Sequence, residues 1–237
     1  MSKLKWYEDF YSKGDWNYPT LERGIKELKG YLLIHNVFNK ASGFEYKNLR
    51  VLDIGCGTGY WSEIFSLLDM DVVGIDFSKI AIKKATEKWK HPQFMVGDGT
   101  ALPYKENVYD IIFCKGCSLF NTFDLSKIKS LMDYYLNFLK KDGFIVFISA
   151  SDLSGLQYPP NDWINHNQRD ILSFFDKCNG RVIGPIFTMS RLLKLCELIP
   201  TRLLKQVFIN FVSRGMELYA KIRKQKISYI YVVVKNE

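Results

Sequence analysis

The sequence predicts an α/β fold in which a doubly wound, mostly parallel sheet is covered by helices on both faces. Two patterns predict it: short, continuously apolar segments alternate with helical stretches, and the last apolar segment alternates Tyr and Val. Continuous apolar runs are typical of parallel strands that are buried on both faces. The alternation in the final segment indicates an antiparallel strand near the end of the chain.

The predicted elements follow one another in the order that such a sheet requires. Helical spacing of apolar residues predicts a helix over 21–38, ahead of the first strand. The predicted strands are Arg50–Ile54, Asp71–Ile75, Gln93–Val96, Tyr109–Cys114 and Phe144–Ser149. The predicted helices between them are Tyr60–Leu68, Ser78–Lys90 with Ser78 as its N-cap, and Leu125–Leu139, which a turn at Asp142–Gly143 follows.

The regular alternation stops after Ala150. Residues 151–170 are rich in Asp, Asn, Pro, Tyr and Trp, which predicts a long loop of the kind that often carries function. Helices are expected near Asp170–Cys178 and Ser190–Ile199. An ambiguous basic and apolar segment follows them, and the last strand is expected over Ser228–Val234.

Length and composition favour one globular domain. The chain has 237 residues, of which 47% are hydrophobic and 24% are charged. We expect a cytoplasmic protein, because no secretion signal is recognisable and no stretch is apolar enough to cross a bilayer. Among the five cysteines only Cys114 and Cys117 form a CxxC pair, so we expect reduced thiols and no metal.

A glycine loop, "VLDIGCGTGYW", follows the first predicted strand. Gly55, Gly57 and Gly59 stand where the backbone of an open α/β sheet must approach a ligand. In the dinucleotide fingerprint GxGxxG the third glycine comes one residue later than it does here. The bulky Tyr60 and Trp61 also fit poorly beside a pyrophosphate, so the loop indicates another nucleoside ligand.

Three acidic residues accompany this loop. Asp53 lies inside the first strand, where a carboxylate is costly without a partner, and Asp76 ends the second strand, where it can accept hydrogen bonds from a ribose. Asp98 follows the third strand and can accept a hydrogen bond from an exocyclic amine. Three carboxylates favour a cationic nucleoside over a pyrophosphate.

In four blocks the sequence resembles the class I S-adenosylmethionine-dependent methyltransferases. The blocks are "VLDIGCGTGYWS" (51–62), "VVGIDFS" (72–78), "GDGTALPYKENVYDIIFC" (97–114) and "LKKDGFIVFI" (139–148), in the order and spacing of the family. The resemblance implies a Rossmann-like fold and S-adenosyl-L-methionine as cofactor, with S-adenosyl-L-homocysteine as product. A nicotinamide-dependent enzyme is the alternative that the general fold leaves open.

The resemblance also implies a set of cofactor-binding residues. The methionine part would contact Gly55, Cys56, Gly57 and Gly59, and Asp53 would hold the ammonium group through backbone or water. The nucleoside would lie against Asp76, which binds the ribose, Phe77, which stacks on adenine, and Asp98 with Gly99 at the adenine amine. Cys114 and Lys115 would border the sulfonium, and the expected site also includes Tyr11, Trp16, Ser78 and Thr100.

The chain is accordingly expected to be a single methyltransferase domain over 1–237. Residues 1–45 would form an N-terminal helical segment or lid, 46–150 the cofactor-binding core, and 151–237 an acceptor-side loop, basic helices and the last strand.

Residues outside the core are the candidates for acceptor binding. They are Tyr7 in the aromatic N-terminal segment and Tyr158 and Arg169 in the loop after the fifth strand. His166 is the histidine in that loop and titrates near neutral pH, so we nominate it as the general base. His35 and His91 are expected at the surface, without a role.

Positive charge is concentrated near the end of the chain. Residues 191–226 hold nine Lys or Arg and two Glu, a surplus of seven in a chain whose net charge is +8. This segment is interpreted chiefly as an amphipathic helix that packs its apolar side on the sheet and leaves its basic side in solvent. Alternatively, this segment can attract an anionic acceptor, make a weak contact with a membrane surface, or bind nucleic acid.

We therefore expect a methyltransferase that acts on a small, anionic or sugar-linked metabolite, by O-methylation rather than N-methylation. An RNA methyltransferase is the first alternative, but nucleic acid is not expected as a partner, because no separate binding module or basic extension precedes the sheet. A non-catalytic S-adenosylmethionine-binding protein is the second. The sequence does not set the oligomeric state.

Overall fold

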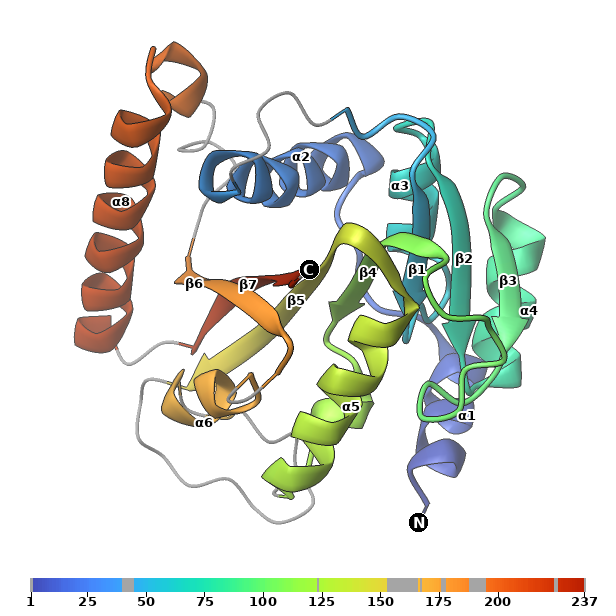
Figure 1. Cartoon of the computed structure of the whole chain (residues 1–237). Coiled ribbons are helices and arrows are strands. Elements are labelled where there is room, and N and C mark those ends of the chain that lie inside the picture. Colours follow the sequence, from blue (N-terminus) through green and yellow to red (C-terminus); the bar gives the residue numbers. More distant parts are fainter. Residues whose placement is uncertain are drawn as a thin grey trace.

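The computed structural model describes residues 2–39, 45–122, 124–152, 166, 168–175, 178–187, 195–223 and 226–236. In this part of the chain seven strands form one sheet in the order β3-β2-β1-β4-β5-β7-β6 (Figure 1). The strands are β1 (Arg50–Ile54), β2 (Asp71–Asp76), β3 (Gln93–Val96), β4 (Tyr109–Lys115), β5 (Leu139–Asp152), β6 (Gly180–Ile186) and β7 (Lys226–Lys235). The first five are parallel, and β7 is antiparallel to its neighbours β5 and β6, which confirms the predicted mixed sheet.

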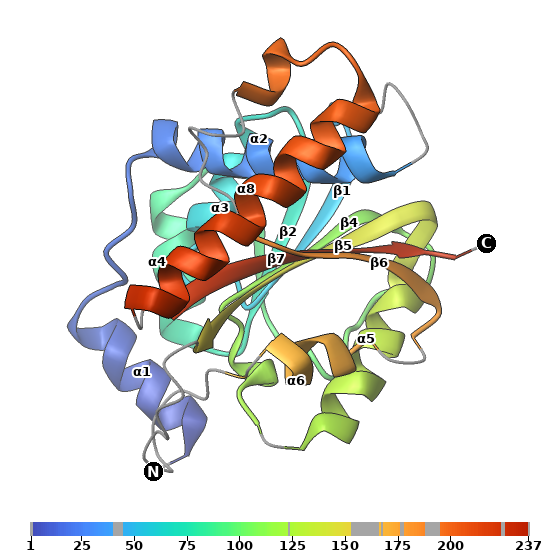
Figure 2. The same ribbon diagram turned by 90° about the vertical axis from the view of Figure 1, so that its left-hand side faces the viewer.

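Helices cover both faces of the sheet. They are α1 (Lys3–Lys13), α2 (Leu21–Phe38), α3 (Tyr60–Ser66), α4 (Lys79–Lys88), α5 (Leu125–Phe138), α6 (Gln168–Ser173) and α8 (Arg202–Arg223), with short 3-10 turns η1 (Ser118–Phe120) and η2 (Cys196–Leu198). Figure 2 shows α2 and α8 on one side of the sheet and α5 and α6 on the other. Each side has its own buried apolar cluster.

The strand order reverses between β1 and β4, so the loops that follow these two strands diverge. Ligands of open α/β sheets bind at the carboxyl ends of the strands at such a point. In Figure 1, α1 lies beyond the carboxyl end of β2. The fold therefore places the predicted glycine loop and the N-terminal segment at the same edge of the sheet.

Two features of the sheet differ from the sequence prediction. The predicted turn at Asp142–Gly143 is an irregularity inside β5, where Tyr109 pairs with Leu139 but Ile111 pairs with Phe144. Asp142 has a left-handed φ of 63°, so the chain turns locally without leaving the strand. The sequence prediction also lacked β6, because Gly180 and the Gly184–Pro185 pair have the composition of a loop.

The ambiguous basic segment forms the long helix α8, but its orientation contradicts the expectation. Leu203, Leu204, Val207 and Phe211 were expected to pack on the sheet, and all four are exposed. Phe208 packs against the core instead. Ile209 and Ala220 are also buried, Leu195 is exposed, and 191–194 lie outside the described residues.

The predicted surface position of His35 is also wrong. His35 is fully buried, and its ring stacks on Phe144 with 3.7 Å between the centroids. Burial lowers the pKa of this imidazole to about 4, so it is neutral at physiological pH. His91 is at the surface as expected and lies 3.5 Å from the carboxylate of Glu63.

Candidate active site

A large cavity of about 2340 Å³ opens at the carboxyl ends of β1, β2 and β4. Its walls also come from α1, the start of α2 and the η1 turn. Most of the residues predicted to bind cofactor or acceptor line this cavity: Tyr7, Tyr11, Trp16, Asp53, Gly55, Cys56, Gly57, Asp76, Phe77, Asp98, Gly99, Thr100 and Lys115. The structure thus brings together residues from five separate stretches of the sequence.

Three predicted cofactor residues lie beside the cavity and are not among its lining residues. Gly59 has a φ of 81° and precedes α3, and a Cβ there would come within 2.5 Å of the Phe94 ring. The Ser78 hydroxyl caps α4 by accepting a hydrogen bond from Ala81 N, 3.1 Å away. Cys114 is buried in the core. These residues contribute to the conformation and packing of α3, α4 and β4, which lie next to the cavity.

The glycine loop is bonded directly to the end of β2. Gly57 N donates to Asp76 Oδ2 at 3.0 Å, and Ser78 N donates to Asp76 Oδ1 at 2.9 Å. Gly57 has a φ of 55°, and a Cβ there would lie 2.8 Å from the Tyr11 hydroxyl. A side chain at this position would therefore strain the backbone and also push against the aromatic wall.

Two buried carboxylates stand in the same wall. Asp53 is buried, and Ser62 Oγ donates a hydrogen bond of 2.6 Å to its Oδ2. Burial, with a smaller contribution from the nearby Asp76, raises the pKa of Asp53 to about 7. Burial also raises the pKa of Asp76. A positively charged ligand in the cavity would offset this cost and favour the ionised carboxylates.

Helix α1 covers the cavity with aromatic side chains. The Tyr7 ring lies edge-on to Phe77, with 5.3 Å between the centroids, and Tyr11 is buried. Burial raises the pKa of Tyr7 to about 12 and that of Tyr11 further, so both hydroxyls stay protonated. The Trp16 indole N–H points to the Tyr11 hydroxyl at 3.4 Å. The predicted N-terminal segment is therefore a helical wall of the cavity.

Hydrogen bonds connect α1 to the start of α4 and to the η1 turn. The Glu8 carboxylate accepts hydrogen bonds from the backbone of Lys79 at 2.8 Å and Ile80 at 3.3 Å, at the beginning of α4. At the other side, Lys3 Nζ donates to the carbonyl oxygens of Asn121 at 2.8 Å and Ser118 at 3.3 Å. A carboxylate at a helix N-terminus is favoured by the unpaired N–H groups and the helix dipole.

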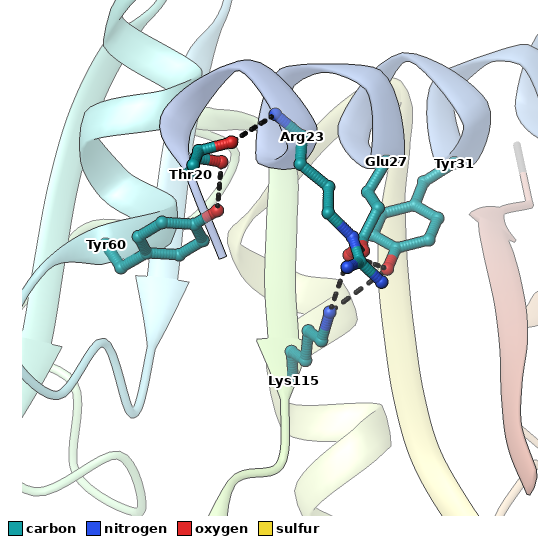
Figure 3. Close-up of polar contacts among 6 residues, drawn as sticks. All are labelled: Thr20, Arg23, Glu27, Tyr31, Tyr60 and Lys115. Carbon is teal, nitrogen blue, oxygen red and sulfur yellow. Dashed lines mark hydrogen bonds and ion pairs between the residues drawn. The ribbon is translucent and has the colours of Figure 1, made fainter. Parts of the chain in front are cut away.

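A charged cluster lies at the cavity wall, to which it contributes Arg23, Glu27 and Lys115 (Figure 3). Lys115 Nζ, at the end of β4, lies 3.5 Å from Glu27 Oε2 and 3.1 Å from the Tyr31 hydroxyl. Arg23 Nε lies 3.6 Å from Glu27 Oε1. The Lys115 ammonium also lies 4.0 Å from the centroid of the Trp61 ring. We call Arg23, Glu27, Tyr31 and Lys115 the α2–β4 cluster.

Burial lowers the pKa of Lys115, and the neighbouring Glu27 counteracts this by favouring the charged form. Sequence reasoning identified Lys115 but missed Arg23, Glu27 and Tyr31. A signal was present, because these three residues recur every four positions along α2 and therefore share one helix face. That face differs from the apolar face formed by Leu21, Leu28 and Leu32.

The nominated base His166 is not among the lining residues in the described part of the chain. Its side chain is buried, with Nε2 3.1 Å from the carbonyl oxygen of Phe120 and its ring edge-on to Phe174. Burial lowers the pKa of this imidazole, and the Phe120 carbonyl counteracts it. His166 thus supports η1, and its role as a base stays a prediction. Tyr158 and the side chain of Arg169 lie outside the described residues.

Comparisons with known proteins agree with this arrangement. Residues 51–143 match a family described as "Methyltransferase domain". A demethylmenaquinone methyltransferase of Renibacterium salmoninarum is 40% identical over 63 residues, which is 27% of each chain. The uncharacterized methyltransferase YcgJ of Bacillus subtilis is 28% identical over 130 residues, 51% of this chain and 47% of that relative. The matched segments therefore span a quarter to a half of these relatives.

Similarity to solved structures extends over most of the chain. The crystal structure of Bacillus subtilis YcgJ superposes with a TM-score of 0.53 at 17% identity, covering 89% of this chain and 99% of that one. Haemonchus contortus phosphoethanolamine N-methyltransferase 2, solved with phosphomonomethylethanolamine and S-adenosylhomocysteine, superposes with a TM-score of 0.55 at 16% identity, covering 88% and 53%. At these identities the likeness shows a shared Rossmann-like fold.

Proposed function

Because residues 51–143 match a methyltransferase-domain family, we propose that the protein is a class I S-adenosylmethionine-dependent methyltransferase and that it methylates a small molecule that carries an anionic group. S-adenosylmethionine supplies a methyl group on a positively charged sulfur when it is bound. The acceptor is proposed to enter beside the α2–β4 cluster. An oxygen atom is proposed as the methyl acceptor.

The cavity residues fit this cofactor. The two buried carboxylates Asp53 and Asp76 gain favourable interactions from a ligand with ammonium and sulfonium charges. Phe77, below the Tyr7 ring, offers an aromatic surface for adenine. Asp98 lies in the same wall, in the position proposed for the adenine amine. The left-handed Gly57 leaves the space that a Cβ would occupy.

One observation carries the acceptor proposal: the Lys115 ammonium and the Arg23 side chain line the same cavity as the glycine loop. Lys115 is the last residue of β4, and Gly116, Cys117 and Ser118 continue the wall toward α1. Lys115 is partly buried and Arg23 is exposed at the cavity wall, and cations in such positions favour a carboxylate or phosphate on the acceptor. Such a contact would fix the acceptor's orientation toward the methyl group, which is the main requirement of a displacement reaction.

Glu27 is proposed as the group that receives a proton when the acceptor is a hydroxyl. It lies on the acceptor wall, and its ion pairs with Arg23 and Lys115 hold its carboxylate in place. A general base must lie within hydrogen-bond reach of the acceptor, which α2 allows by its position along the cavity. An acceptor that is itself a carboxylate would need no base.

The proposal is tested by methyl transfer from labelled S-adenosylmethionine to matched acceptors. The panel pairs carboxylates and phosphomonoesters with their neutral esters and includes a structured RNA as a separate arm. We expect label on anionic small molecules, and a Lys115→Met variant should lose that preference. Transfer to RNA alone, or equal transfer to neutral and anionic partners, would contradict the acceptor class. Cofactor binding without transfer to any acceptor would favour a binding protein.

A further inference from the structure

Helix α8 presents an apolar stripe on the side that faces away from the sheet. Phe211 and Ile222 are 76% and 72% exposed, which is unusual for side chains of this size. The residues that form the stripe are Leu203, Leu204, Val207, Phe211, Leu218 and Ile222, and all are exposed. At 100° per residue they fall within a sector about 100° wide, so they form one band along the helix, which Arg214 interrupts between Phe211 and Leu218. We call this band the α8 stripe.

The opposite side of α8 is anchored to the fold. Ile209, Ser213 and Ala220 are buried on that side. The Ser213 hydroxyl accepts a hydrogen bond of 2.9 Å from Phe187 N, and Arg202 Nε donates to the carbonyl oxygen of Val37 at 2.8 Å. Figures 1 and 2 both show α8 along the outside of the molecule. The rotation of the helix is therefore fixed, and the stripe faces outward because of it.

Basic side chains accompany the stripe. α8 contains five Lys or Arg residues and one Glu. On the helical projection Lys221 lies at one edge of the stripe and Arg214 lies within its sector, and both are exposed. Tyr219 is also exposed, with the Arg223 guanidinium 5.8 Å from its ring centroid. Apolar side chains between cations and a tyrosine are the composition of helices that lie in a membrane interface.

We propose that the α8 stripe docks on the surface of an anionic lipid bilayer, with the helix axis parallel to the membrane plane. The apolar residues would enter the boundary of the acyl chains, and Arg214 and Lys221 would meet lipid phosphates. No helix in the described residues can cross a membrane, so the contact is peripheral. A second copy of the chain fits less well, because a two-fold contact through this face would oppose cations to cations.

The test is co-sedimentation of the full chain with vesicles of phosphatidylcholine, with and without about one third phosphatidylglycerol. The wild type should bind the anionic vesicles, release them at high salt, and leave neutral vesicles largely unbound. The double variant Phe211→Asp, Leu218→Asp should lose binding about tenfold or more, and Arg214→Glu severalfold. Controls are Leu67→Asp and Lys83→Glu, which change exposed residues outside α8 and should bind as the wild type does.

Three results would overturn the proposal. The first is a wild-type protein that does not bind anionic vesicles at low salt. The second is a Phe211→Asp, Leu218→Asp variant that binds them as well as the wild type does. The third is a wild-type dimer in analytical ultracentrifugation that the same variant converts to a monomer, because the stripe would then belong to a second copy.

Discussion

The Lys115 ammonium lies 3.5 Å from the Glu27 carboxylate and joins the carboxyl end of β4 to helix α2 at the wall of the central cavity. Both side chains are mostly shielded from solvent, and Tyr31 and Trp61 complete the surroundings of the ammonium. The ion pair holds the Lys115 ammonium at the wall of the cavity that the glycine loop also lines. Under the proposed function, this charge favours an acceptor that carries an anionic group.

Replacing Lys115 by Met should reduce kcat/KM for anionic acceptors about 10- to 100-fold, because a charge-assisted hydrogen bond to the acceptor is lost. Affinity for S-adenosylhomocysteine should change less than about threefold, since the ammonium lies on the acceptor side. Steady-state kinetics and calorimetry measure the two effects. Lys83→Met, on the exposed side of α4, is the control. A Lys115→Met enzyme with full activity on anionic acceptors would exclude Lys115 from acceptor binding.

Replacing Glu8 by Ala should loosen α1, because two backbone N–H groups at the start of α4 lose their acceptor. A lost helix cap costs about 1 kcal/mol, which is enough to increase the open population of a lid several-fold. We expect faster cleavage of α1 in limited proteolysis and faster release of S-adenosylhomocysteine. Asp9→Ala changes an exposed acid of the same helix and is the matched control. Equal cleavage of both variants would show that Glu8 does not hold the lid.

Replacing Asp53 by Asn should change how stability without ligand depends on pH. The folded pKa of about 7 lies above the unfolded value of about 3.9, so folding stability falls as pH rises from about 4 to about 7. Asn stays neutral and can still accept the Ser62 hydrogen bond. At pH 8 the variant should therefore be more stable by about 4 kcal/mol, and near pH 4 it should match the wild type. Denaturant titrations that give parallel pH profiles would refute the raised pKa.

His166 was nominated as a base, and its position beside the Phe120 carbonyl suggests a supporting role for η1. His166→Asn retains an N–H donor for that carbonyl, and His166→Ala does not. If His166 supports η1, Ala should lower the thermal midpoint by a few degrees and Asn should largely restore stability and turnover. Loss of turnover in both variants, with normal cofactor binding, would instead establish His166 as the base.

The sequence predicted an element well where the local spacing of its apolar residues agrees with the side that is buried in the fold. The strands β1 and β3 and the helix α2 have the predicted bounds, since continuous apolar runs and helical spacing mark them directly. The strand β6 escaped prediction because Gly184 and Pro185 interrupt it, and its pairing with β7 is made across a large sequence separation. Pairing with a strand that is distant in the sequence produces no recognisable local pattern of residues in such a segment.

The sequence predicted only part of the site, because some of the site's contacts join residues that are far apart in the sequence. The glycine loop, Asp53 and Asp76 lie within contiguous motifs, and the structure brings them into one cavity. Arg23 and Glu27 belong to the site through the contact between α2 and the end of β4; their four-residue spacing shows a shared helix face but not which element that face meets. In α8 the apolar spacing was visible, but large apolar side chains lie on both the side that packs on the core and the side that faces solvent. Periodicity alone therefore assigned the wrong face.

The most direct test of a cofactor site in this cavity is calorimetric titration of S-adenosylhomocysteine into the wild type and Asp76→Ala. Asp76 accepts hydrogen bonds from Gly57 and Ser78 and is the proposed ribose contact, so its loss removes both the loop's anchor and the ligand's partner. We predict one site in the wild type and an affinity at least about 100-fold lower in Asp76→Ala, with circular dichroism showing that the fold persists. No binding by the wild type, or equal affinity in a folded Asp76→Ala variant, would contradict the account.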